Sequence, residues 1–453
     1  MVADRPQTLS CQDEQRSNRK AHQDGAFLHD KYYHESQFAS RDFFNFETTS
    51  VLPRHRWYYL KEGFSTSLVE EAISRQLVGN NRELHLLEPF CGTGTTPLTA
   101  ALTGHYCTAI EVNPFLAFTA QTKTITGPWR NKCYFGNLEK VIAASPSGTQ
   151  SPLEGFSTFT EGNGHDKWLF NIDVLRRFTA LQQAIEIHGG TYKKAMKLSA
   201  IVAAYKCCNA KRDGKALRYK SNWKDLKYSG DDLFRQFQIH ARMIPEDVEE
   251  QPINPIFKPR IHVADAREQI STLEDDQFDL VVTSPPYLNS FDYSDVYRPE
   301  LFLGGFVETN KDLRKIRLAT LRSHIQVKWP DVTSFKSTLL DPVLEELNES
   351  KGLWDERIPL MVRAYFDDMW KIFKAIRPKM RRGGQVWLVV STSAYGGVHI
   401  PVDLIVADAA NQAGFDLEGV YKLRHLRAAG QQWKQFKIVA PPLRESLVIL
   451  SNA

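Results

Sequence analysis

Residues 278–287, FDLVVTSPPY, indicate the architecture expected for this chain. The apolar run at residues 280–282 is typical of a short buried strand. The strand has to end before the two prolines, because consecutive prolines lack N–H donors and cannot continue a sheet. In an open α/β sheet, ligands bind at the carboxyl ends of the strands. The stretch therefore predicts a strand that delivers Ser-Pro-Pro-Tyr to a binding site.

The Ser-Pro-Pro-Tyr elbow suits the methylation of an exocyclic amino group. Such a nitrogen attacks poorly because its lone pair is delocalised into the base ring. Two acceptors on its N–H bonds would free the lone pair, and the Ser284 hydroxyl and the Pro285 carbonyl are the candidates. Tyr287 is placed to stack on a base swung out of its helix. An ordinary Pro-Pro turn after a strand explains the tetrapeptide alone equally well.

A second stretch, HLLEPFCGTGTT at residues 85–96, has the pattern of a strand, a glycine turn and a helix. The strand is expected to end at Glu88, and Gly92 and Gly94 form the turn. This arrangement lets the backbone approach a ligand closely at a helix N-terminus. It is not a P-loop, because no lysine follows the second glycine. The stretch therefore predicts a turn whose backbone approaches a ligand.

Acidic residues close two further predicted strands. CTAIEV, residues 107–112, carries Glu111 near its end, where an acid can accept hydrogen bonds from two ribose hydroxyls. A strand beginning at Arg260 is expected to end at Asp265. A surface acid that merely closes a strand is the plainer interpretation of Glu111, but its position downstream of a glycine turn favours the cofactor role.

Composition and charge exclude several classes of protein. The 453 residues have a net charge of +4, which permits a nucleic-acid partner without demanding one. The six cysteines form no CxxC pair and no zinc spacing, so we expect reduced thiols, a cytoplasmic location and no metal. We also expect no membrane span and no signal peptide. The chain contains no Pro-Cys dipeptide of the kind that a covalent C5-cytosine mechanism uses.

The length and the order of motifs predict three parts. Residues 1–45 form a polar leader that we expect to be disordered, and residues 46–126 together with 259–453 form the catalytic α/β domain. Residues 127–258 are predicted to be a mostly helical insertion, and a basic segment within it suits DNA. A solvated charged loop explains that segment equally well. Its candidate nucleic-acid contacts are Lys211, Arg212, Lys215, Arg218, Tyr219 and Lys220.

The four motifs LEPFCGTGTT, IEVNP, HVADA and DLVVTSPPY, in this order, resemble those of the S-adenosylmethionine-dependent DNA amino-methyltransferases. The TSPPY form is most similar to the cytosine-N4-specific enzymes. The resemblance implies an α/β, Rossmann-like, seven-stranded methyltransferase sheet with a reversed last strand, helices on both faces and helical insertions. It also implies S-adenosyl-L-methionine as cofactor and site-specific methylation of DNA in a restriction–modification or related system. DNA is then the partner, and a cognate restriction endonuclease is a further candidate.

The resemblance assigns site residues one by one. The catalytic residues it implies are Ser284, Pro285, Pro286 and Tyr287. The cofactor-binding residues it implies are Phe64, Ser65, Glu88, Phe90, Gly92, Gly94, Glu111 and Asp265. The chain departs mildly from many relatives at Glu88 and Cys91.

Two alternatives remain open. The first is methylation of another amino group, such as adenine N6 in DNA or an amino group in RNA. Relatives of those kinds usually carry Asp or Asn where Ser284 stands. The second is a non-catalytic nucleic-acid-binding protein with a retained methyltransferase fold, which the intact glycines, acids and Ser-Pro-Pro-Tyr disfavour.

Overall fold

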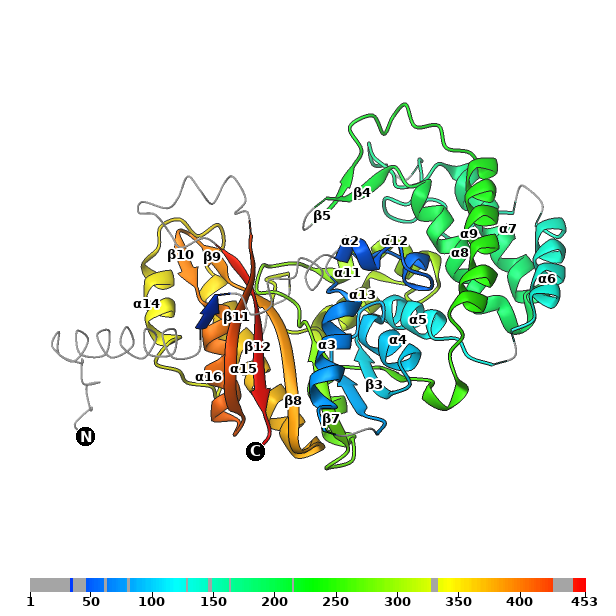
Figure 1. The fold of residues 1–453 in the computed structure, drawn as a ribbon. Helices are drawn as coiled ribbons and strands as arrows, with labels where there is room; N and C mark the ends of the chain where they lie inside the picture. The colour runs from blue at the N-terminus through cyan, green and yellow to red at the C-terminus, as the bar shows by residue number, and fades with distance from the viewer. Residues whose placement is uncertain are drawn as a thin grey trace, which may run out of the picture. The chain divides into compact units, whose positions relative to one another are not determined.

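The structure is a computed structural model, and it divides the chain into two compact units (Figure 1). Unit 1 comprises Met1–Ser40, Ile270–Ser290 and Leu321–Ala453, and unit 2 comprises Arg41–Gln269 and Phe291–Thr320. Both units are therefore assembled from separate stretches of sequence. The residues that the structure describes are 33–35, 46–60, 63–79, 82–127, 129–145, 149–162, 164–213, 216–326, 333–426 and 443–453.

Unit 2 contains three parallel strands in the order β2-β3-β6. They are β2 (His85–Glu88), β3 (Tyr106–Glu111) and β6 (Arg260–Val263). Helix α4 (Thr95–Leu102) connects β2 to β3 and packs against both, as a parallel pair of strands requires. Because the strands are parallel, their carboxyl ends lie along one edge.

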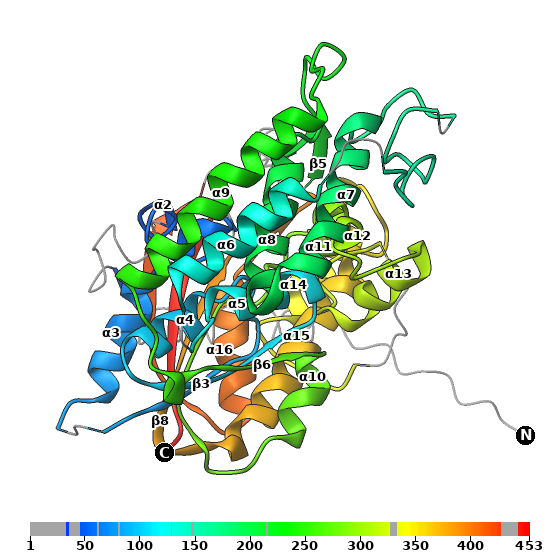
Figure 2. The same ribbon diagram turned by 90° about the vertical axis from the view of Figure 1, so that its right-hand side faces the viewer.

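The remaining part of unit 2 is mainly helical. Figure 2 shows α6, α7, α8 and α9 packed alongside one another, and their inward side chains form a large apolar core. The chain between α8 and α9 forms a two-stranded hairpin of β4 (Ala210–Asp213) and β5 (Ala216–Tyr219). The helices are α2 (Phe46–Thr49), α3 (Thr66–Gln76), α5 (Pro114–Lys123), α6 (Asn131–Ala143), α7 (Ile172–His188), α8 (Lys193–Lys206), α9 (Gly230–Glu250), α10 (Ala266–Gln269), α11 (Tyr293–Val296), α12 (Arg298–Leu303) and α13 (Asn310–Ala319).

Unit 1 contains a sheet in the order β1-β11-β12-β8-β7. Strand β7 is parallel to β8, and β12 runs antiparallel between β8 and β11, so the expected reversed last strand is confirmed. Helix α16 (Val402–Gln412) packs on β8, β11 and β12, beside α15 (Ile358–Ile376) (Figure 1). The strands are β1 (Tyr33–Glu35), β7 (Phe278–Thr283), β8 (Met380–Ser391), β11 (Asp416–His425) and β12 (Arg444–Ser451). A hairpin of β9 (Ser393–Tyr395) and β10 (Val398–Ile400) and helix α14 (Asp341–Glu349) complete the unit.

The α/β class and the mostly parallel sheet are confirmed. The seven expected strands are present, with three in unit 2 and four in unit 1, and β1 is an additional edge strand. Of the predicted leader, the structure describes only β1. From the sequence alone, residues 307–358 are expected to be helical, but this expectation is wrong between α13 and α14. There the Arg322 side chain binds Asp367 and Asp368, and no helix forms in the described residues of that segment.

None of the helices in the described part of the chain has both the length and the hydropathy that crossing a bilayer requires.

A buried carboxylate in unit 2 joins the segment before α3 to helix α9. Asp247, which is completely buried, accepts hydrogen bonds from the Arg54 backbone N–H at 2.9 Å and from the Trp57 indole N–H at 2.8 Å. The Arg56 guanidinium pairs with the same carboxylate. Arg54 turns its own guanidinium to the carbonyls of Lys123, Ile125 and Gln251. One acid and one arginine therefore tie together three separate stretches of the unit.

Replacing Asp247 with Ala is expected to lower the free energy of unfolding by roughly 3–5 kcal/mol, because it leaves a guanidinium and two buried N–H groups without their acceptor. Denaturant unfolding followed by tryptophan fluorescence measures the loss. The control is Glu246→Ala on the exposed side of the same helix, which should change stability by no more than about 0.5 kcal/mol. Equal effects of the two substitutions would contradict the role given to Asp247.

Candidate functional site

The glycine turn of unit 2 is closed by the acid that precedes it. Glu88, at the end of β2, is 1% exposed. One carboxylate oxygen accepts the Phe90 N–H at 3.0 Å, and the other accepts the Thr96 hydroxyl at 2.8 Å. Glu88 thus fixes both ends of the loop from β2 to α4. Its predicted contact with a cofactor stays a prediction.

Both glycines of the turn have left-handed backbone conformations. Gly92 has φ of 53° and Gly94 has φ of 90°, which side chains with a Cβ rarely adopt. A Cβ on Gly94 would lie 2.8 Å from the Ala120 Cβ on α5, and a Cβ on Gly92 would lie 2.9 Å from the Leu60 side chain. The fold itself therefore requires both glycines. A bulky substitution there disturbs packing as well as any bound ligand.

Glu111 lies directly against the glycine turn. Its two carboxylate oxygens accept the N–H groups of Gly92 and Asn113, each at 2.8 Å. Burial raises the pKa of Glu111 from its ordinary value of 4.5 to about 7, although hydrogen bonds from the backbone of Asn113, Gly92 and Val112 oppose the shift. Gly92 and Glu111, which the sequence assigns to one site, are thus in contact.

Asp265 follows the third strand of the same edge. The neighbouring residue Ala264 donates its N–H to the Glu111 carbonyl at 3.1 Å. The Asp265 carboxylate is held by Arg267, with Nε to Oδ1 at 3.0 Å and Nη2 to Oδ2 at 2.6 Å. Glu88 and Glu111, the last residues of β2 and β3, and Asp265, two residues beyond β6, therefore lie at one edge of the sheet. Sequence reasoning missed Arg267, although its position two residues beyond Asp265 was a possible signal.

The other predicted cofactor residues stand at two places in unit 2. Phe64 and Ser65 are buried directly before α3, which packs against α4, and Ser65 is the N-terminal cap residue of α3. Phe90 is half-buried within the glycine turn. Their contact with a cofactor stays a prediction.

The Ser-Pro-Pro-Tyr elbow of unit 1 follows β7, all six residues of which are buried. The Ser284 hydroxyl donates to the Val389 carbonyl of β8 at 3.0 Å. Because a hydroxyl has one proton and two lone pairs, this bond orients the oxygen of Ser284 as an acceptor. The Tyr287 hydroxyl donates to Glu445 on β12 at 2.7 Å. Pro285 is buried, and Pro286 is half-buried.

The predicted nucleic-acid segment has internal and exposed members. Arg212 is internal: it pairs with the fully buried Glu300 and lies over the rings of Tyr205 and Tyr297, at 4.1 and 4.4 Å. Tyr219 packs against Trp223, whose ring also meets Trp168. These two predicted contacts therefore serve the fold of unit 2.

Three other predicted contacts lie nearer the surface. Lys211 and Arg218 are exposed, and Lys220 is half-buried over the ring of Tyr228. Lys215 lies outside the described residues. A contact of Lys211, Arg218 and Lys220 with DNA stays a prediction.

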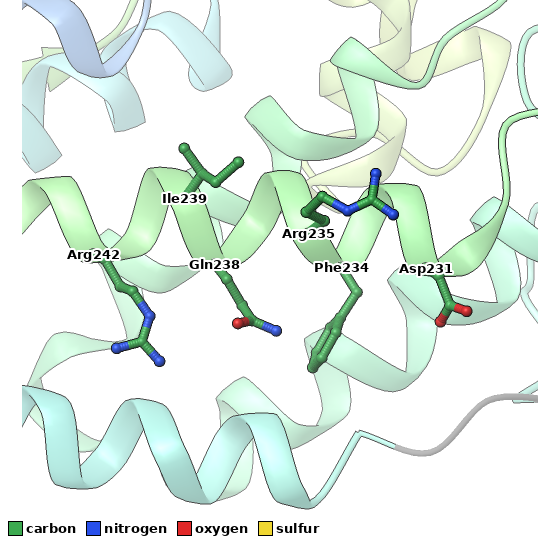
Figure 3. A pocket seen from close by; sticks show the side chains of 6 residues that line it. All are labelled: Asp231, Phe234, Arg235, Gln238, Ile239 and Arg242. Atoms are coloured by element: carbon green, nitrogen blue, oxygen red, sulfur yellow. The ribbon is translucent and has the colours of Figure 1, made fainter.

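A surface hollow on α9, shown in Figure 3, contains none of the predicted site residues. Phe234, Gln238 and Arg242 project from the same side of the helix there. Arg177 lies over the ring of Phe234, and Arg242 pairs with Glu139 of α6. The hollow is therefore lined by groups that join neighbouring helices. Among the residues that the structure describes, no cluster of His, Cys, Asp or Glu is arranged to hold a metal ion.

Comparisons with known proteins agree with the class of site. The UPF0020 family model, described as an RMKL-like methyltransferase domain, matches residues 61–145. The chain is 25% identical over 439 residues to the Type II methyltransferases M.AvaI of Nostoc sp. and of Anabaena variabilis, covering 86% of this chain and 84% of each relative. It is 24% identical to the Type II methyltransferase M.BsoBI of Geobacillus stearothermophilus, covering 92% and 90%. These likenesses support the methyltransferase class for this chain.

Among solved structures, the rRNA methyltransferase aviRa of Streptomyces viridochromogenes is 11% identical, with 93% of this chain and 97% of that chain covered and a TM-score of 0.31. A likeness of this extent carries no conclusion about substrate.

Glu111→Gln tests the buried acid through the pH dependence of stability. Between pH 4.5 and about 7 the folded protein holds a proton on Glu111 that the unfolded chain releases, so the contribution of Glu111 to stability falls as pH rises through this window. The variant lacks this dependence. Its free energy of unfolding relative to wild type should therefore rise by about 3 kcal/mol across the window.

Denaturant unfolding at several pH values measures this difference. The exposed Glu70 of α3 provides the control, since Glu70→Gln removes a surface glutamate and should change stability by no more than about 0.5 kcal/mol. A flat difference for Glu111→Gln would mean that Glu111 titrates normally.

Proposed function

We propose that this protein transfers a methyl group from S-adenosyl-L-methionine to the exocyclic N4 amino group of cytosine in DNA. The observation that carries the proposal is the acceptor orientation of Ser284, at the end of a buried strand and directly before Pro-Pro-Tyr. The similarity to Type II methyltransferases supports DNA as the substrate and a restriction–modification setting, with a cognate endonuclease as partner.

The residues at the glycine turn fit the cofactor. When bound, the cofactor supplies a methyl group bonded to a sulfonium sulfur. This sulfur is a good leaving group, because it departs as a neutral thioether when the methyl–sulfur bond breaks. The left-handed conformations of Gly92 and Gly94 allow the tight turn between β2 and α4, at which the cofactor would bind. The carboxylate of Glu111 accepts backbone N–H groups and would offer its remaining acceptor capacity to a ribose hydroxyl. Asp265 would take the adenine amino group, with Arg267 fixing its carboxylate.

Phe64, Ser65, Glu88 and Phe90 would complete the cofactor side. Glu88 would act through the turn that it closes, because both of its oxygens already accept hydrogen bonds there. Phe64 and Ser65 would lie near the methionine end of the cofactor.

The elbow would prepare the amino nitrogen. The Ser284 oxygen and the Pro285 carbonyl would accept its two N–H bonds, which draws the hydrogens out of the ring plane and frees the lone pair. Tyr287 would stack on the flipped base, a contact worth roughly 1–3 kcal/mol. Pro286 would hold the distance between the acceptors and the ring, because proline fixes φ. The nitrogen attacks directly in this scheme, without a covalent enzyme intermediate.

Ser284→Ala should lower turnover by about 10- to 100-fold and leave cofactor affinity nearly unchanged. The lost acceptor matters most as the nitrogen becomes tetrahedral, and hydrogen bonds to developing charge are worth about 1.5–3 kcal/mol. Mass spectrometry of nucleosides from DNA incubated with protein and labelled cofactor measures turnover, and calorimetry measures cofactor affinity. The matched control is Ser290→Ala in the same loop, because the buried Ser290 hydroxyl makes no hydrogen bond.

The same assay decides the substrate. Label in N4-methylcytosine supports the proposal. Label confined to adenine, or transfer to RNA with none to DNA, would overturn the cytosine assignment even if Ser284 proves essential.

Lys211 and Arg218 are proposed to contact DNA phosphates, because both are basic and exposed on the hairpin. Replacing both with Ala should weaken DNA binding and reduce the slope of log affinity against log salt by about 2, since each phosphate contact adds roughly 0.9 to that slope. Fluorescence anisotropy with a labelled duplex measures both quantities. A double variant at exposed lysines elsewhere, Lys351 and Lys374 both to Ala, is the control. An unchanged slope for the hairpin variant would remove the hairpin from the DNA interface.

A further inference from the structure

The tip of the Tyr287 side chain is held by an acid far away in the sequence. Its hydroxyl donates to Glu445 Oε1 at 2.7 Å. Glu445 stands at the start of β12, and its side chain is 7% exposed. A carboxylate with so little access to water has to be hydrogen-bonded on both oxygens. Part of that requirement is met by the tyrosine.

The rest of the requirement is met by Arg424. Its Nε donates to Glu445 Oε2 at 2.7 Å, and its Nη2 lies 3.3 Å from Oε1. Arg424 and Glu445 stand opposite each other on the paired strands β11 and β12. The planar guanidinium binds the carboxylate on both oxygens, which fixes the direction of its lone pairs. The phenol therefore binds an acceptor that is itself rigid.

The backbone around Tyr287 is held as well. Ser284 binds Val389, the Leu288 carbonyl accepts the Tyr395 hydroxyl at 3.3 Å, and the Ser290 N–H donates to the Ser323 carbonyl at 3.0 Å. Tyr287 itself is half-buried, so part of its surface stays accessible. Hydrogen bonds thus fix the chain on both sides of the residue, and Glu445 fixes the far end of its ring.

We propose that Glu445 and Arg424 are positioning residues that set the orientation of the Tyr287 ring against which the target base stacks. This inference rests on the proposed function, because it assigns a role within the same elbow. A free tyrosine rotates about two side-chain bonds, and stacking a base on it requires that motion to stop. A ring that is already fixed removes this cost when the base arrives. The hydroxyl therefore matters although the aromatic face makes the contact.

A double-mutant cycle of Tyr287→Phe and Glu445→Ala tests the inference. Each single variant should lower methyl transfer by about 5- to 10-fold, the effect of one net hydrogen bond, with cofactor affinity unchanged. The double variant should be no worse than either single variant, because both remove the same bond. Glu445→Gln keeps an acceptor oxygen and should recover part of the loss. Glu418→Ala, at an exposed acid of β11, is the control and should behave as wild type.

If the losses of methyl transfer in the two single variants multiply in the double variant, the inference is overturned. Wild-type methyl transfer by Glu445→Ala would also overturn it. If Glu445→Ala does not fold, the cycle is run with Glu445→Met, which also removes both acceptor oxygens but keeps a side chain of similar size, and the same outcomes decide.

A second readout does not depend on methylation. In protein labelled with fluorotyrosine, the Tyr287 signal is identified as the one that Tyr287→Phe removes from the ¹⁹F spectrum. Glu445→Ala should shift that signal, and Glu418→Ala should not. An unshifted signal refutes the positioning role of Glu445, whatever the protein methylates. A shifted signal in a protein that methylates no base would refute the proposed function, but it would still show that Glu445 holds the Tyr287 ring.

Discussion

A carboxylate that is removed from water must find hydrogen-bond donors, and this constraint organises the glycine turn and the Ser-Pro-Pro-Tyr elbow, for which a function is proposed. Glu88 and Glu111 take their donors from the glycine turn, and in doing so they set its shape. Glu445 takes its donors from Tyr287 and Arg424. In each case the acid stands on a regular strand and at least one donor lies on a less regular segment. These hydrogen bonds thereby hold the loops in place against the strands of the sheet.

The acids also explain why the proposed site residues serve two purposes. Glu111 accepts backbone N–H groups and still has lone pairs for hydroxyls, and Ser284 gives its proton to Val389 and keeps its acceptor capacity. The bonds to the fold consume one part of each group's hydrogen-bonding capacity and aim the other part. The bonds that stabilise the fold and the bonds proposed for ligands thus use different parts of the hydrogen-bonding capacity of the same group.

Sequence reasoning found the elements whose signal is local. The apolar run of β7, the glycine turn and the acids after β3 and β6 are all recognisable within about ten residues, the length over which strand and turn patterns repeat. The β4–β5 hairpin was missed, because its strands are short and highly charged.

The partners of polar side chains were not predictable from the sequence. Arg212 looks like a phosphate contact in a basic run, and only the fold brings Glu300 to it from 88 residues away. Tyr287 and Glu445 are 158 residues apart. A local pattern predicts which kind of ligand an arginine or a tyrosine could bind. Long-range packing decides whether that side chain remains able to bind it or is used by a partner within the fold.

The central place of β12 in the unit 1 sheet governs the order in which this protein can fold during synthesis. In the sheet, β11 is joined to β8 only through β12 (Arg444–Ser451), which lies between them. A nascent chain that has already made β7, β8 and β11 therefore still carries an unfilled gap in its sheet, and Tyr287 still lacks its acceptor. Unit 2 can bury the pair of Arg212 and Glu300 much earlier. Unit 2 is thus expected to be finished first, and the Ser-Pro-Pro-Tyr elbow is expected to be fixed only after β12 has been made.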